Sequence, residues 1–153
     1  MSRGAVIAAA TAASGAAGWV LWSLRRRYVA VTVRGPSMEP AFRPGDRVIV
    51  RRGATPRRGS VVVVEQPSGE DRLRGVPSAR PGPGRAAVDG HRWVIKRVEA
   101  GPGDLRVTDS GETERIPPGC LYLLGDNPPF SVDSRQLGLF SADRVLGVVR
   151  RRI

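Results

Sequence analysis

The chain has 153 residues, of which 41% are hydrophobic and 5% aromatic, with 19 glycines, 13 prolines and a formal net charge of +11. This length gives room for one domain with its own core, and the composition excludes a disordered chain and favours short strands joined by turns. Cys120 is the only cysteine, which excludes an intrachain disulfide and a cysteine-based zinc site. His91 is the only histidine, which excludes most histidine-ligated metal sites. No cofactor is expected.

The first predicted element is the uncharged stretch from Ala5 to Leu24. A helix of this length rises about 30 Å, which is the thickness of the hydrocarbon core of a bilayer. Trp19, Trp22 and the three arginines at 25–27 are typical of a membrane interface. We therefore expect an N-terminal segment, 1–27, that holds a transmembrane anchor; a cleavable export signal or a soluble alanine-rich helix is the alternative.

The rest of the chain, 28–153, changes to alternating and short β-branched patterns that predict strands. The expected strands cover residues 29–33, 47–50, 61–64, 93–98, 105–108, 120–124 and 145–149. The stretch from Gln66 to Gly90 is rich in Pro, Gly, Ser and Arg and has no apolar periodicity, so we expect a flexible insertion there and not a second domain. The fold class predicted for 28–153 is mainly β.

Lys96 is the only lysine in the chain, and every other strongly basic side chain is arginine. A lysine can lose its proton when it is desolvated among apolar neighbours, whereas a guanidinium stays charged. The neighbours of Lys96 are apolar, because it lies in the β-prone run from Trp93 to Val98. Lys96 is thus a candidate base; a chance surface lysine in an arginine-rich chain is the alternative.

A candidate nucleophile lies in the segment from Arg34 to Asp46, which is too rich in Pro and Gly for regular structure and too apolar for a plain surface loop. Such a loop can present Ser37. Serine is a weak nucleophile near neutral pH, and a neutral lysine amine within hydrogen-bond reach can take its proton. A triad of Ser37, His91 and an aspartate is the alternative, although His91 beside the insertion is expected to be solvated.

Three sequence motifs follow one another along the chain. They are Gly35-Pro36-Ser37-Met38-Glu39-Pro40, then Lys96-Arg97-Val98 with Pro102-Gly103-Asp104, then Gly125-Asp126-Asn127 with Ser131-Val132-Asp133-Ser134-Arg135. In this order they resemble the sequence boxes of type I signal peptidases. The small size, without a large inserted domain, is similar to the short bacterial forms and to the mitochondrial inner-membrane peptidases.

The resemblance implies a membrane-bound serine endopeptidase with an antiparallel β catalytic domain that follows one N-terminal transmembrane helix. Such an enzyme removes N-terminal signal peptides from exported precursor proteins. Ser37 matches the nucleophile of the family, and Lys96 matches its general base. Ser131 matches the hydroxyl that orients the lysine, while Asp133 and Arg135 match a structural ion pair.

The residues around Ser37 match the substrate and oxyanion region of the family, with one difference. Some relatives carry a serine where this chain has Gly35, and Pro36 has no N–H, so the oxyanion hole would rest chiefly on the backbone N–H of Ser37. Met38 is expected to be packed or to line the pocket. The pair Asp126–Asn127 is expected to consist of turn residues that bond the backbone.

The resemblance further implies precursors with Ala-x-Ala-like cleavage sites, contact with membrane phospholipids, and a single-pass protein of the cell membrane with its catalytic domain outside the cytoplasm. The arginines after the anchor would, by the positive-inside rule, favour the opposite orientation. A soluble self-cleaving regulator with the same Ser-Lys chemistry is one alternative. A basic nucleic-acid-binding protein is another; the arginines are scattered without aromatic residues between them, so no nucleic acid partner is expected.

Overall fold

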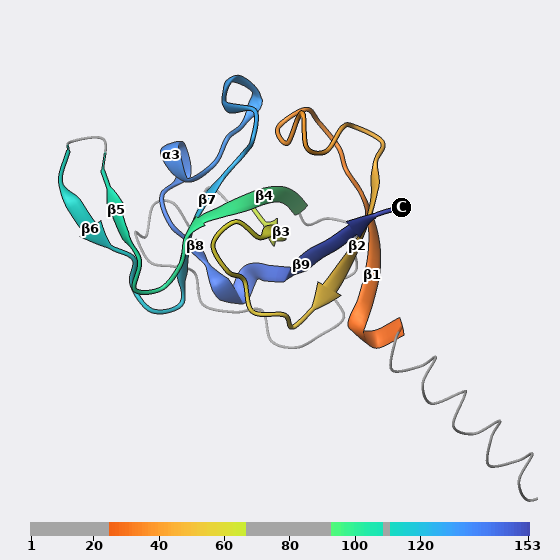
Figure 1. The fold of residues 1–153 in the computed structure, drawn as a ribbon, viewed down its shortest axis with the longest axis horizontal. Helices are drawn as coiled ribbons and strands as arrows, with labels where there is room; N and C mark the ends of the chain where they lie inside the picture. Colours follow the sequence, from red (N-terminus) through yellow and green to blue (C-terminus); the bar gives the residue numbers. More distant parts are fainter. Residues whose placement is uncertain (1–24, 67–92, 109–110) are drawn as a thin grey trace, which may run out of the picture.

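The computed structural model describes residues 25–66, 93–108 and 111–153 (Figure 1). The predicted anchor, His91 and nearly all of the predicted insertion lie outside the described residues. Within the described ranges no helix is both long enough and apolar enough to cross a bilayer.

The regular structure of the described residues is mainly β-strand, and every strand predicted from the sequence is present. The strands are β1 Tyr28–Thr32, β2 Arg47–Arg52, β3 Val61–Glu65, β4 Trp93–Ala100, β5 Leu105–Val107, β6 Thr113–Arg115, β7 Cys120–Leu124, β8 Phe140–Ser141 and β9 Val145–Arg152. Short helices are η1 Pro128–Phe130, α3 Ser134–Leu137 and η2 Ala142–Arg144. The prediction of a mainly β domain is therefore confirmed.

The main sheet has the strand order β1-β2-β9-β3-β4-β7-β8, and every pairing in it is antiparallel. The last strand, β9, thus lies in the middle of the sheet between β2 and β3. β9 approaches β2 so closely that a Cβ added to Gly147 would overlap the carbonyl oxygen of Arg51. β9 therefore joins the part of the sheet formed by β1 and β2 to the part formed by β3, β4, β7 and β8.

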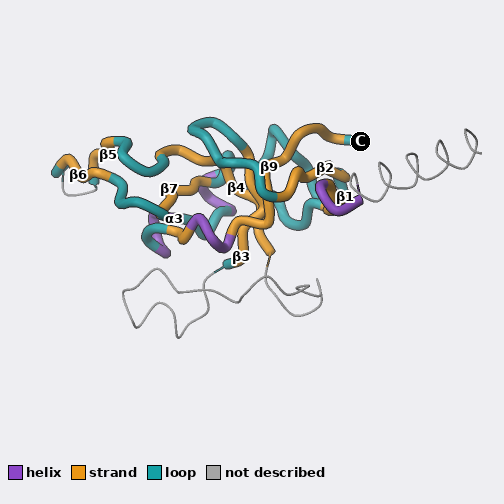
Figure 2. Tube along the Cα trace, turned by 90° about the horizontal axis from the view of Figure 1, so that it is seen from below, coloured by secondary structure: helices purple, strands orange, loops and turns teal. Residues whose placement is uncertain are grey.

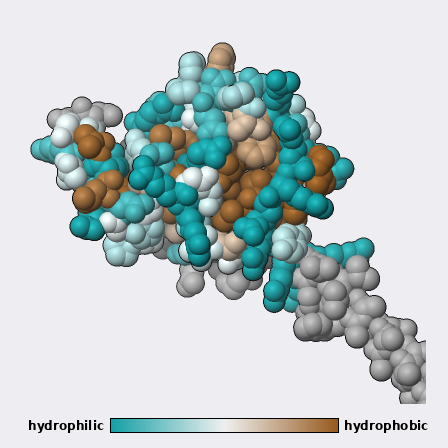
Figure 3. Space-filling view, viewed as in Figure 1, coloured by the Kyte–Doolittle hydropathy of each residue, from teal (hydrophilic) through white to brown (hydrophobic). Residues whose placement is uncertain are grey.

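A two-stranded hairpin, β5 and β6, projects from the end of the molecule opposite β1 and the C-terminus (Figures 1 and 2). All three residues of β6 are exposed, and their sequence, Thr-Glu-Arg, has no apolar alternation that could have predicted a strand. Two exposed apolar side chains of β5, Leu105 and Val107, lie on this hairpin, where Figure 3 shows apolar surface apart from the main body.

The core has two main apolar clusters, and β3 contributes to both of them. Val61 and Val63 pack in one cluster and Val62 and Val64 in the other, as expected when successive side chains of a strand point to opposite faces. The four-valine run is therefore buried on both faces of the sheet. The first cluster also holds Met38, which is fully buried.

Candidate active site

The loop between β1 and β2 carries Ser37 and is closed at its neck by backbone hydrogen bonds. The N–H of Val33 donates to Asp46 O (2.8 Å), and the N–H of Gly45 donates to Val33 O (3.0 Å). Met38 anchors the loop in the core from within, next to the half-buried Ser37. Of the two expectations for Met38, packing in the core is the one observed. Met38 does not line the pocket described below.

Lys96 lies on β4 opposite Val62 of β3, and its side chain is only 2% exposed. Its Nζ donates a hydrogen bond to Ser131 Oγ at 2.7 Å. Burial lowers the pKa of Lys96 below its ordinary value of 10.5, because desolvation disfavours the ammonium form. The Asp133 carboxylate acts in the opposite direction on this pKa, and the Arg135 guanidinium lowers it further.

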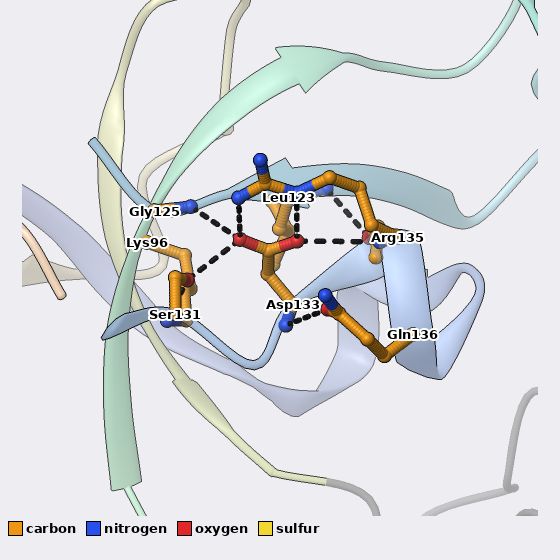
Figure 4. A network of polar contacts seen from close by, with 8 residues as sticks. Lys96, Leu123, Gly125, Ser131, Asp133, Arg135 and Gln136 are labelled. Atoms are coloured by element: carbon orange, nitrogen blue, oxygen red, sulfur yellow. Dashed lines mark hydrogen bonds and ion pairs between the residues drawn. The ribbon is translucent and has the colours of Figure 1, made fainter. Parts of the chain in front are cut away.

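Asp133 joins Ser131 to the rest of the site and is fully buried (Figure 4). Its Oδ2 accepts hydrogen bonds from Ser131 Oγ (2.6 Å), from the N–H of Gly125 (2.9 Å) and from Arg135 Nη2 (2.7 Å). Its Oδ1 accepts from Arg135 Nε at 2.9 Å, so the pair is bidentate. Lys96, Ser131, Asp133 and Arg135 therefore form one continuous polar network.

The charge of Asp133 is stabilised by these donors. Burial by itself raises the pKa of Asp133, but hydrogen bonds from Arg135, from Ser131 and from the Gly125 N–H outweigh it and hold the pKa well below the ordinary value. Asp133 is therefore ionised at any pH at which a peptidase would work. A carboxylate only accepts hydrogen bonds, so the single proton of Ser131 is directed to Asp133.

Asp133 is also the N-cap of the short helix α3. Its side chain accepts from the N–H of Arg135, and Gln136 Oε1 accepts from the N–H of Asp133 at 3.0 Å, which completes a capping box. Ser134 Oγ accepts from the N–H of Leu123 and so ties α3 to β7. The spacing of Asp133 and Gln136 is the capping-box signal for this helix, which was not predicted.

The segment Gly125-Asp126-Asn127 connects three parts of the site. Gly125 binds Asp133, as described above. Asp126 accepts two hydrogen bonds from Arg97, at 2.8 and 2.6 Å, and this ion pair raises the pKa of Arg97. The expectation that Asp126 bonds the backbone is wrong, because Arg97, next to Lys96 on β4, reaches its carboxylate.

Asn127 does bond the backbone, and its partners lie in the loop that carries Ser37. Its Nδ2 donates to Pro36 O at 3.1 Å, and its backbone N–H donates to Ser37 O at 3.0 Å. These contacts bring together residues that are about 90 positions apart in the chain. No pattern in the sequence predicts this pairing.

One open pocket brings Ser37 and Lys96 to the same surface. It is lined by Arg34, Gly35, Pro36, Ser37, Gln66, Val94, Lys96, Phe130 and Val132. Gly35 and Pro36 line this pocket beside Ser37. The described ranges hold no cluster of three or more His, Cys, Asp or Glu side chains that could bind a metal ion.

The chain is similar to known peptidases. Two family models match, "Peptidase S24-like" over residues 7–76 and "Signal peptidase, peptidase S26" over residues 105–153. Signal peptidase I V of Bacillus subtilis is 27% identical over 140 residues, which cover 80% of this chain and 83% of that protein. Signal peptidase IB of Staphylococcus aureus is 29% identical over 143 residues, which cover 79% and 75%.

These matches support the type I signal peptidase family as the family of this chain. The same matches support a serine endopeptidase. Signal peptidase I of Bacillus caldolyticus shows a further local similarity, 38% identity over 47 residues, which are 31% of this chain and 26% of that protein. The range matched by the first family model contains Ser37, and the range matched by the second contains the segment from Gly125 to Arg135.

Gly125 belongs to the third motif, but its close packing in the site was not predicted from the sequence. A Cβ added there would overlap Ser131 Oγ and would approach Ser37 O to 2.7 Å. The loop that carries Ser37 and the Ser131 hydroxyl therefore meet at this glycine. We expect Gly125→Ala to push Ser131 away from Lys96 and to lower kcat/KM by about a hundredfold, since displacements near 1 Å in a catalytic site have effects of this size.

A matched control for this substitution is Gly101→Ala, because a Cβ at Gly101 would have its nearest neighbours at 3.9 and 4.0 Å. Activity against a fluorogenic peptide and the thermal unfolding midpoint should both stay close to wild type in this variant. Equal activities of the Gly125→Ala and Gly101→Ala proteins would contradict the close packing at Gly125.

Proposed function

We propose that this chain is a membrane-bound endopeptidase that removes N-terminal signal peptides from exported precursor proteins, with Ser37 as nucleophile and Lys96 as general base. The observation that carries the proposal is that the only lysine of the chain is buried, has a lowered pKa and lines the same pocket as Ser37. The names of the relatives, which are signal peptidases, support the substrate class.

In the proposed mechanism the neutral amine of Lys96 takes the proton of Ser37 Oγ while the oxygen attacks the carbonyl carbon of the scissile peptide. The resulting ammonium gives this proton to the nitrogen of the leaving peptide as the C–N bond breaks. Water then attacks the acyl-enzyme ester, and Lys96 acts as base for this second step. The mature protein leaves first and the signal peptide second.

Ser131 orients Lys96 for this role. Because the proton of Ser131 goes to Asp133, the hydroxyl can only accept from Lys96. A neutral amine has two N–H groups and one lone pair; with one N–H bound to Ser131, the lone pair is turned away from Ser131 and is available to Ser37. The bidentate pairing of Arg135 with Asp133 offsets the negative charge that would otherwise favour the ammonium.

The proposed location and substrate preference rest on the sequence. Ala5–Leu24 would anchor the protein in the cell membrane as a single pass in contact with phospholipids, with the catalytic domain outside the cytoplasm, because export signals emerge on that side. Precursors would be cut after Ala-x-Ala-like sites, since shallow pockets admit only small side chains.

The proposal is tested with the full chain in detergent and a purified precursor that carries an Ala-x-Ala site. We expect one cut after the second alanine, identified by the mass of the products, and no cut when that alanine is replaced by phenylalanine. Chelation with EDTA should leave the rate unchanged. Cleavage of the chain itself without cleavage of the precursor would favour the self-cleaving regulator, and a zinc-restored loss in EDTA would overturn the Ser-Lys assignment.

A further inference from the structure

Asn127 is the only asparagine in the chain, and it holds the backbone on both sides of the Ser37 nitrogen. Its Nδ2 binds the carbonyl oxygen of Pro36, and its own N–H binds the carbonyl oxygen of Ser37. Among the described residues no acceptor is bonded to the N–H of Ser37. The two carbonyls that flank this N–H are thus fixed, while the N–H itself is available.

The geometry of the peptide unit links the direction of the Pro36 carbonyl to the direction of the Ser37 N–H. The peptide between Pro36 and Ser37 is trans and planar, so its C=O and its N–H point to opposite sides of the chain. A donor that holds the Pro36 carbonyl from one side therefore directs the Ser37 N–H to the other side. Rotation of this peptide plane would turn the N–H away and would break the two hydrogen bonds that Pro36 O accepts, from Asn127 Nδ2 and from the N–H of Glu39 (3.1 Å).

We propose that Asn127 is a positioning residue that aims the Ser37 N–H at the oxyanion formed during peptide cleavage. This inference rests on the proposed function, in which Ser37 is the nucleophile. The direction of the Ser37 N–H matters because Gly35 has no side chain, and Pro36 has no N–H, that could supply a second oxyanion donor. A single donor in an oxyanion hole is worth about a hundredfold or more in kcat.

Asn127 is itself held by its neighbours. Gly125 is bonded to Asp133 in the network that contains the base, and Asp126 is bonded to Arg97 beside that base. The N–H of Phe130 donates to the carbonyl oxygen of Asn127 at 3.1 Å. The same segment therefore fixes the base and the oxyanion donor relative to each other.

The test uses the full-length protein and the variants Asn127→Ala and Asn127→Asp. The first removes the side-chain donor, and the second keeps the shape but places a carboxylate oxygen against Pro36 O. Both keep the backbone N–H bond to Ser37 O. The control is Arg115→Ala, which removes another side-chain bond to a loop carbonyl, Gly103 O at 2.7 Å, in the β5–β6 hairpin.

Three quantities are measured for each protein: kcat and KM for a peptide substrate, the affinity for a peptide aldehyde, and the affinity for the corresponding peptide alcohol. Ser37 Oγ adds to the aldehyde carbon to form a hemiacetal, whose oxygen lies where the oxyanion would form. The alcohol has no such carbon and reports ground-state binding. Thermal unfolding is followed in parallel.

We expect both Asn127 variants to lower kcat by about ten- to a hundredfold with little change in KM, and aldehyde affinity to fall by the same factor. Alcohol affinity, the unfolding midpoint and the Arg115→Ala protein should stay close to wild type. An unchanged kcat would overturn the proposal. So would equal losses of aldehyde and alcohol affinity together with a lower unfolding midpoint, because these indicate only a structural role.

Failure of the proposed function would be visible separately, in the wild-type protein. If Ser37 is not the nucleophile, the aldehyde forms no adduct at Ser37 in wild type, and the inference about Asn127 falls with it. If the wild-type adduct forms and the Asn127 variants bind the aldehyde equally well, only the inference about Asn127 is overturned.

Discussion

Lys96→Arg is expected to abolish cleavage as completely as Lys96→Ala, with a loss in kcat/KM of about a thousandfold or more. An unperturbed lysine is neutral in only about one molecule in a thousand or fewer near pH 7, so the site must favour the neutral amine. Burial of Lys96 does this and lowers its pKa. The same burial cannot lower the pKa of a guanidinium to near pH 7, because that pKa begins about two to three units higher and the charge is delocalised.

The matched control is Arg58→Lys, which exchanges the same two residue types in an exposed ion pair with Glu99. This variant should cleave peptides at the wild-type rate. Wild-type activity should rise with pH on its acid side as Lys96 loses its proton, because only the neutral amine can act as base. Near-normal turnover of Lys96→Arg with an unchanged pH profile would mean that another group is the base.

Ser37→Ala is expected to remove activity to the level of the uncatalysed reaction while the protein stays folded. Loss of the nucleophile in a serine peptidase costs several orders of magnitude in kcat. The stability effect should be small, about 0.5 kcal/mol or less, because Ser37 is only half-buried and its hydroxyl has no hydrogen bond among the described residues.

Ser60→Ala is the control for this change. Ser60 Oγ accepts a hydrogen bond from the N–H of Arg57 at 3.3 Å in a turn outside the pocket, so its removal should leave the rate of cleavage intact. Precursor cleavage and the thermal unfolding midpoint are measured for both variants. Retention of even a tenth of the wild-type rate by purified Ser37→Ala would show that Ser37 is not the nucleophile.

The sheet was predictable from the sequence where its strands are apolar. The valine run of β3 and the β-branched alternation of β2 indicate strands by themselves, because their side chains fill the core. The exposed strand β6 was not predictable, since it exists only by pairing with β5. Four-residue α3 is held by a capping box and by Ser134, and not by any helical periodicity.

The candidate site was predictable only in part. The motifs around Ser37 and Lys96 indicated the two groups that we propose carry the chemistry, because a nucleophile and a base have residue types of their own. The roles of Gly125 and Asn127 depend on how closely two distant loops approach each other. Such packing leaves no pattern in one sequence, and a glycine or an asparagine after a strand usually indicates only a turn.

The pKa of Lys96 is the measurement that tests the central claim most directly, and the sequence makes it simple. Because Lys96 is the only lysine, protein grown with lysine labelled with ¹⁵N at Nζ gives one side-chain nitrogen signal in the NMR spectrum. Its chemical shift is followed against pH in the full-length protein. We predict a titration midpoint clearly below the ordinary 10.5. A midpoint at or above 10.5 would mean that Lys96 is a cation at working pH, and it would contradict its role as the base that activates Ser37.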